Sequence, residues 1–124
     1  MPSSSPRALV VKITCGAEAP ERLNQGLTVA ATAVAAGAEV SLWLTGDASW
    51  LAVPGRAQTL ALDHAAPAAD LLGAVIGGGR VTLCGQCAAR RGLDGGDLLD
   101  GVEVRGAATF VEEILRAGAQ ALVY

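Results

Sequence analysis

The stretch Val81-Thr-Leu-Cys-Gly-Gln-Cys-Ala-Ala-Arg-Arg-Gly92 predicts a buried strand that is followed by a short helix. The first three residues are typical of the end of a strand, and Ala88 to Arg91 favour a helix. Gly92 can close that helix in a left-handed conformation. A strand joined to a helix in this way predicts an α/β fold.

The same stretch holds two cysteines, Cys84 and Cys87. A thiol at a strand-to-helix junction faces the amides and the positive end of the helix, which favour the thiolate. Arg90 and Arg91 add positive charge nearby, although a solvated helix end favours such residues equally. The spacing lets one sulfur attack the other, so the sequence predicts a reactive pair with Cys84 as the nucleophile. The alternative is that Cys84 only fills space at the strand end.

Strand and helix patterns alternate on both sides of this stretch. Nearly continuous apolar runs predict buried strands, and apolar residues at helical spacing predict helices. The predicted strands are Ala8–Thr14, Glu39–Thr45, Thr59–Leu62, Arg80–Cys84 and Ala119–Tyr124. The other predicted helices run from Pro20 to Gly37, from Asp47 to Leu51, from Pro67 to Ile76, and from a capping box at Thr109 and Glu112 to Gly118. The acidic stretch from Asp94 to Gly101 is expected to be an ordered loop with one helical turn.

Five short strands separated by helices imply a parallel sheet covered on both faces. In such sheets, catalytic groups gather outside the carboxyl ends of the strands. We therefore expect Cys15, His64 and Cys84 at one edge, after the first, third and fourth strands. His64 could donate a proton near the thiol, but a lone histidine after a strand is more often a loop residue. The role of Cys15 stays open.

Length and composition exclude several classes of protein. A chain of 124 residues forms one domain, here 8–124, after a short, polar and flexible tail at 1–7. A net charge of −3 argues against a nucleic-acid partner. No apolar run is long enough for a membrane span, and the tail is too short and polar for a signal peptide, so we expect a cytoplasmic protein. Three cysteines do not form a secreted disulfide framework.

The chain resembles the DsrE/DsrF-like family, which includes the sulfur-relay subunit TusD. The resemblance covers nearly the whole chain. It is carried by Gly16–Arg22, Ala36-Gly37, Leu42–Asp47, Cys84–Gly92 and Gly101-Val-Glu-Val-Arg-Gly106. It implies a three-layer α/β/α sandwich with a five-stranded parallel sheet, and assembly as a homotrimer or hexamer.

For the site, the resemblance implies that Cys84 carries sulfur as a persulfide, that Cys87 matches a second family cysteine, and that the partners are sulfur donor and acceptor proteins. Cys15 is outside the pattern. Two alternatives stay open: a dithiol–disulfide oxidoreductase using Cys84 and Cys87, and a non-catalytic oligomeric binding module. We expect no cofactor and no metal, although Cys15, His64, Cys84 and Cys87 could in principle form a tetrahedral zinc set.

Overall fold

The computed structural model describes residues 7–124, so the expected tail lies outside the described residues apart from Arg7. One parallel sheet has the strand order β4-β3-β2-β1-β5. Its strands are β1 (Ala8–Ile13), β2 (Glu39–Leu44), β3 (Arg80–Cys84), β4 (Val102–Arg105) and β5 (Gln120–Val123). The α-helices are α1 (Pro20–Ala35), α2 (Ala68–Gly78), α3 (Gly85–Arg90) and α4 (Ala107–Ile114). Three short 3-10 helices join them: η1 (Gly46–Ala52), η2 (Ala57–Thr59) and η3 (Gly95–Asp97).

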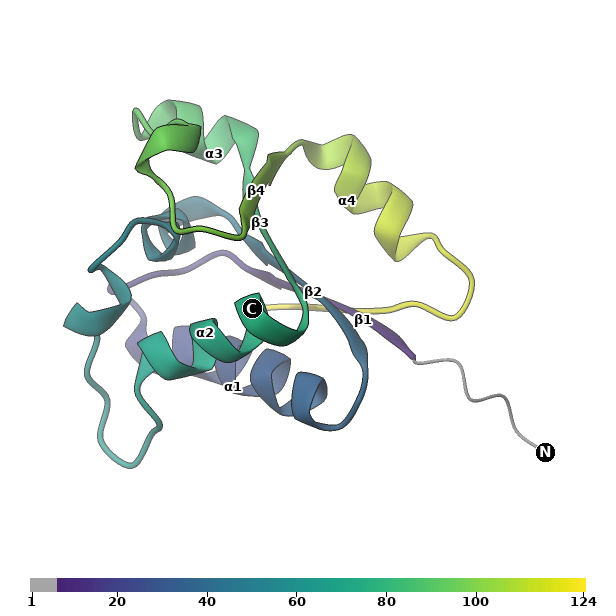
Figure 1. Ribbon diagram of the computed structural model, residues 1–124, viewed down its shortest axis with the longest axis horizontal. Coiled ribbons are helices and arrows are strands. Elements are labelled where there is room, and N and C mark those ends of the chain that lie inside the picture. The colour runs from purple at the N-terminus through teal and green to yellow at the C-terminus, as the bar shows by residue number, and fades with distance from the viewer. Residues whose placement is uncertain (1–6) are drawn as a thin grey trace.

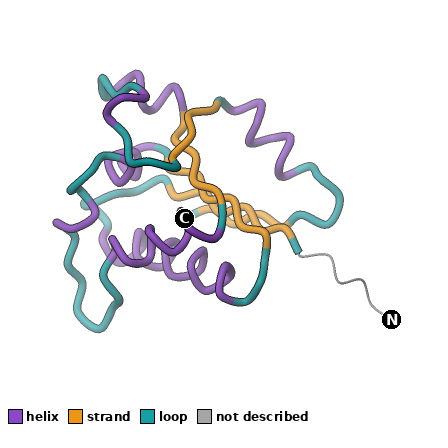
Figure 2. The backbone as a smooth tube through the Cα atoms, viewed as in Figure 1, coloured by secondary structure: helices purple, strands orange, loops and turns teal. Residues whose placement is uncertain are grey.

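The helices form layers on the two faces of the sheet. Helices α1 and α2 lie side by side beneath one face, and α4 crosses the other (Figure 1). Helix α3 extends β3 beyond its carboxyl end with no intervening loop, as the colours of the tube show (Figure 2). The three-layer α/β/α fold is therefore confirmed. Within residues 7–124, no helix is both long enough and apolar enough to cross a membrane.

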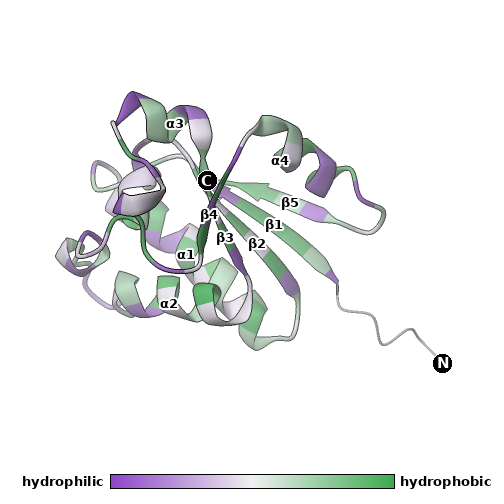
Figure 3. Ribbon diagram, turned by 45° about the horizontal axis from the view of Figure 1, so that its top comes forward, coloured by the Kyte–Doolittle hydropathy of each residue, from purple (hydrophilic) through white to green (hydrophobic). Residues whose placement is uncertain are grey.

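The face toward α1 and α2 holds the hydrophobic core. Parallel neighbours in register point to the same side, so Val11, Leu42 and Val81 form one buried row across three strands. A second row one pleat further on contains Ile13, Leu44 and Leu83. These rows pack with apolar residues of both helices, and Figure 3 shows the hydrophobic colour along β1, β2 and α2.

The opposite face is polar, and α4 covers it. Its central row runs across four strands through Lys12, Trp43, Thr82 and Glu103. The Phe110 ring of α4 packs edge-on against Trp43, with the ring centroids 5.4 Å apart. Because side chains alternate along a strand, Cys84 points to this same face, two residues beyond Thr82. The sheet thus separates an apolar core from a face that carries charge and a thiol.

One predicted strand was wrong and one strand was missed. The stretch Thr59–Leu62 is the end of η2 followed by irregular chain, because Leu60 and Leu62 line a cavity with residues of α1 and β3 pairs directly with β2. Strand β4 lies in a stretch for which no strand was predicted. It has only four residues, with half-buried Val102 and Val104 alternating with exposed residues, and it pairs with β3 at one edge.

The helix ends also differ from the prediction in places. Helix α4 begins after Gly106, so Thr109 lies inside it instead of capping it, and the helix ends at Ile114, short of Gly118. A capping box does exist at η3, between Asp94 and Asp97, within the helical turn expected there. Helix α2 continues through two glycines to Gly78.

Candidate functional site around Cys84

Cys84 is the last residue of β3 and the N-cap of α3. Its backbone is still extended, with φ −63° and ψ 125°, and the helix begins at the next residue. The side chain is half-buried and its sulfur is a free thiol. Free amides of the first helical turn therefore surround the sulfur, as the sequence indicated.

The surroundings of this sulfur favour its anion. Burial alone would raise the pKa of the Cys84 thiol, but four groups together lower the pKa below its ordinary value. Hydrogen bonding by the amide and thiol of Cys87 and by the amide of Gln86 lowers the pKa of Cys84, and the positive charge of Lys12 lowers it further. Cys84 thus has a larger thiolate fraction at neutral pH than an ordinary cysteine.

Cys87 lies in the first turn of α3 and is buried, 8% exposed. Its sulfur accepts a hydrogen bond from the amide of Gly46 at a distance of 3.3 Å. Gly46 adopts a left-handed φ of +52°, and a Cβ atom there would lie only 2.4 Å from the carbonyl oxygen of Thr14. A glycine at the carboxyl end of β2 therefore holds the Cys87 thiol in the first turn of α3, three residues after Cys84.

The two arginines of α3 lie in different surroundings. Arg90 is exposed at the end of the helix. Arg91 forms an ion pair with Asp47 at 2.8 Å and donates to the carbonyl oxygen of Cys87 at 3.1 Å. Arg91 thus ties α3 to η1, and the cation that acts on the Cys84 sulfur is Lys12.

The structure separates the other two expected site residues. Cys15 follows β1 but is buried in the core cluster, 2% exposed, and burial raises the pKa of its thiol; Arg22 offsets this in part. His64 does not follow a strand, so that expectation was wrong. It is exposed, with a left-handed φ of 58°, in the loop after η2, and this loop borders α1.

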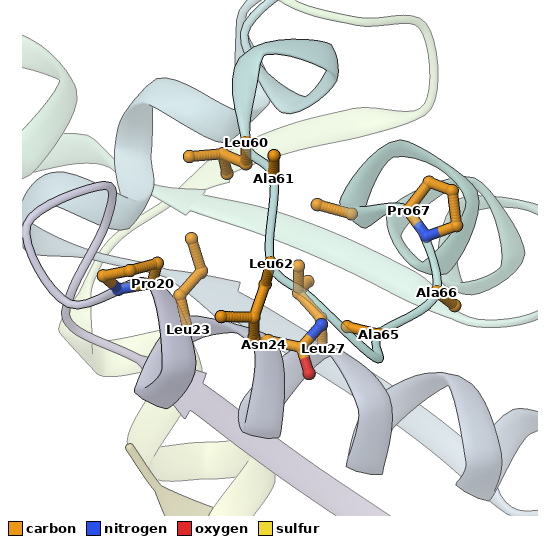
Figure 4. Close-up of a pocket in the computed structure, with 11 residues that line it drawn as sticks. Pro20, Leu23, Asn24, Leu27, Leu60, Ala61, Leu62, Ala65, Ala66 and Pro67 are labelled. Atoms are coloured by element: carbon orange, nitrogen blue, oxygen red, sulfur yellow. The ribbon is translucent and has the colours of Figure 1, made fainter.

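That loop instead borders a cavity of about 250 Å³ between the first turns of α1 and α2. The lining is apolar except for Asn24, with Leu23 and Leu27 of α1 facing Leu62 (Figure 4). Cys84 does not line it. Among residues 7–124, no three histidine, cysteine or acidic side chains come together to bind a metal ion, so the zinc set considered from the sequence is not assembled.

Sequence reasoning missed two contributors to the site. The sequence pattern gives Gly46 no role in the site, yet its amide donates a hydrogen bond to the sulfur of Cys87. Lys12 was treated only as part of a buried strand, although it is the one charged residue in the run Ala8–Thr14. A charged residue in an otherwise apolar strand was the signal that could have pointed to Lys12 as a site residue.

Comparisons with known proteins agree with this fold. The ychN protein from E. coli has a similar structure, with a TM-score of 0.69 and 18% identity, covering 97% of this chain and 100% of that chain. MTH1491 from Methanobacterium thermoautotrophicum, a protein of unknown function, gives a TM-score of 0.63 and 14% identity with the same coverage. A comparison with curated proteins gives no match. The sequence model of the DsrE/DsrF-like family matches residues 8–123, so this chain belongs to the DsrE/DsrF-like family.

Proposed function

We propose that this protein carries sulfane sulfur as a persulfide on Cys84 and passes it to an acceptor thiol. The observation that carries the proposal is the half-buried Cys84 thiol at the start of α3, whose pKa is lowered by two helix amides, the Cys87 thiol and Lys12. A sulfur carrier needs a thiolate near neutral pH that a partner can reach. Membership of the family supports this choice among thiol chemistries.

Loading begins when the Cys84 thiolate attacks the outer sulfur of a donor persulfide. The donor S–S bond breaks, the donor leaves as a thiolate, and a new S–S bond forms on Cys84. In delivery, an acceptor thiolate attacks the outer sulfur on Cys84, and Cys84 leaves as a thiolate. No net electrons are exchanged in either step. The groups that stabilise the Cys84 anion also make it a good leaving group.

Cys87 gives the site a second chemistry. Its thiolate can attack the inner sulfur of the Cys84 persulfide, forming a Cys84–Cys87 disulfide and releasing hydrosulfide. The sulfane sulfur is then reduced by two electrons and the two cysteines are oxidised by two, so an external dithiol must restore them. The Cys87 thiol follows Cys84 by three residues and lowers the pKa of its thiol, which supports the alternative of a dithiol–disulfide oxidoreductase.

Assembly and partners form part of the proposal. Four large hydrophobic residues are exposed along α4 and β5: Val111 at 44%, Leu115 at 76%, Leu122 at 41% and Val123 at 64%. Exposed apolar side chains on a covering helix and on an edge strand are typical of surfaces that a protein covers, and they support a homotrimer or hexamer. Donor and acceptor proteins must then reach Cys84, which lies beside Arg105, just before the start of α4. The free thiols support a reducing, cytoplasmic location.

Mass spectrometry after incubation with a small-molecule persulfide donor tests this proposal. We expect an adduct of about 32 Da on Cys84, lost on addition of an acceptor thiol and absent from Cys84→Ser. Cys87→Ser should still load and should hold the adduct longer. Dithiol–disulfide cycling without an adduct would favour the oxidoreductase. The absence of both the adduct and the disulfide would favour a binding module.

A further inference from the structure

Lys12 lies on the polar face of the sheet in a setting that leaves its charge without an acidic partner. It is half-buried on β1, beside Trp43 of β2 and Val123 of β5. Its carbonyl oxygen accepts from the amide of Tyr124 at 2.8 Å, so the backbone is held from both sides. Among residues 7–124, its ammonium has no carboxylate within ion-pair distance.

The nearest acid on the covering helix is already occupied. One oxygen of Glu113 accepts from Ser41 Oγ at 2.6 Å and from Trp43 Nε1 at 2.9 Å. Its other oxygen pairs with Arg80 at 3.2 Å. With these three donors, the Glu113 carboxylate has little capacity left to accept a hydrogen bond from Lys12, although Lys12 and Glu113 both face the layer between α4 and the sheet.

An aromatic ring holds the ammonium in place of a carboxylate. Lys12 Nζ lies 5.1 Å from the centroid of Phe110, within the range of a cation–π interaction. The ring is itself fixed against Trp43. A ring attracts the cation without neutralising it, so the positive charge still acts on any anion at the same face of the sheet.

The anion that can use this charge is the sulfur of Cys84. The other charged groups near Cys84 are compensated: Arg105, its register neighbour on β4, pairs with Glu103 at 2.8 Å, and Arg91 of α3 pairs with Asp47 of η1. We propose that Lys12, held by Phe110 on the same sheet face as Cys84 and kept from Glu113, is a positioning residue that helps to retain the Cys84 sulfur as an anion, both as thiolate and as persulfide.

This inference rests on the proposed function for the persulfide, but it makes a separate claim about the thiol. Alkylation of Cys84 should be followed against pH, with the modified peptide identified by mass spectrometry. In Lys12→Met the midpoint of the profile should move to higher pH, and alkylation near neutral pH should slow by at least about threefold. Lys12→Arg should restore the profile. Arg90→Met removes an exposed cation from α3 and should leave the midpoint unchanged.

The outcomes separate the two proposals. An unchanged midpoint in folded Lys12→Met overturns the role of Lys12, whether or not the wild type forms a persulfide. A wild type that gains no sulfur adduct overturns the carrier function, while the shifted midpoint would still support Lys12. If Lys12→Met fails to fold, Phe110→Leu decides: it releases the ammonium without changing the strand, and alkylation as fast as in the wild type overturns the inference.

Discussion

Glu113 offers the sharpest test of how α4 is held on the sheet. The variant Glu113→Ala removes the carboxylate that accepts from Ser41, Trp43 and Arg80. The indole of Trp43 is 1% exposed, so its N–H would lose its partner in a place that water does not reach. The matched control is Glu112→Ala, the preceding residue of the same helix, which is exposed.

The expected loss follows from these contacts. An unsatisfied buried donor costs about 1–3 kcal/mol, and the hydroxyl of half-buried Ser41 adds roughly 1 kcal/mol. The pair with Arg80, whose side chain is 55% exposed, contributes at most about 1 kcal/mol. We expect the free energy of unfolding to fall by about 3 kcal/mol in Glu113→Ala and by less than about 0.5 kcal/mol in Glu112→Ala.

Urea unfolding, followed by tryptophan fluorescence at fixed protein concentration, measures both variants. With a slope of about 1.5 kcal/mol per molar urea, the midpoint of Glu113→Ala should fall by about 2 M. Glu113→Gln keeps an acceptor oxygen and should lie between the wild type and Glu113→Ala. Equal midpoints for Glu112→Ala and Glu113→Ala would refute the view that this carboxylate holds the helix.

Three further predictions concern the thiols, a turn and the exposed hydrophobic residues. Because the pKa of Cys84 is lowered and that of Cys15 is raised, alkylation of Cys84 should persist as the pH falls from about 8 to about 7, whereas Cys15 should react only at higher pH. If Cys84→Ala keeps the fastest phase of alkylation, Cys84 is not the most reactive thiol. Gly46→Ala should lower the free energy of unfolding by about 2 kcal/mol or more. Gly37→Ala should lower it by about 1 kcal/mol, because Gly37 also has a left-handed φ but nothing lies within 4 Å of a Cβ atom there. Equal losses in urea unfolding would contradict the clash at Gly46. Leu115→Lys combined with Val123→Lys should shift sedimentation toward the monomer, and a wild type that is monomeric at micromolar concentrations would count against assembly.

The sequence by itself predicted the α/β fold, a parallel sheet covered on both faces and the position of Cys84, because each depends on local pattern. Continuous apolar runs identify strands buried on both faces, and the junction at Cys84 needs only a strand that ends where a helix begins. Strand β4 escaped because four residues at a sheet edge, with half of them exposed, carry little apolar pattern. The stretch 59–62 has that pattern, but it lines a cavity beside α1 instead of joining the sheet.

Only the tertiary structure decided which groups surround the sulfur. The amide of Gly46 reaches Cys87 across 41 positions of sequence, and Glu113 reaches Ser41 across 72. No local pattern encodes such contacts, since they depend on the strand order and on the face that α4 covers. The same register sets Lys12 on the face of Cys84, while the adjacent arginines that the sequence favoured lie at a helix end and in an ion pair with Asp47.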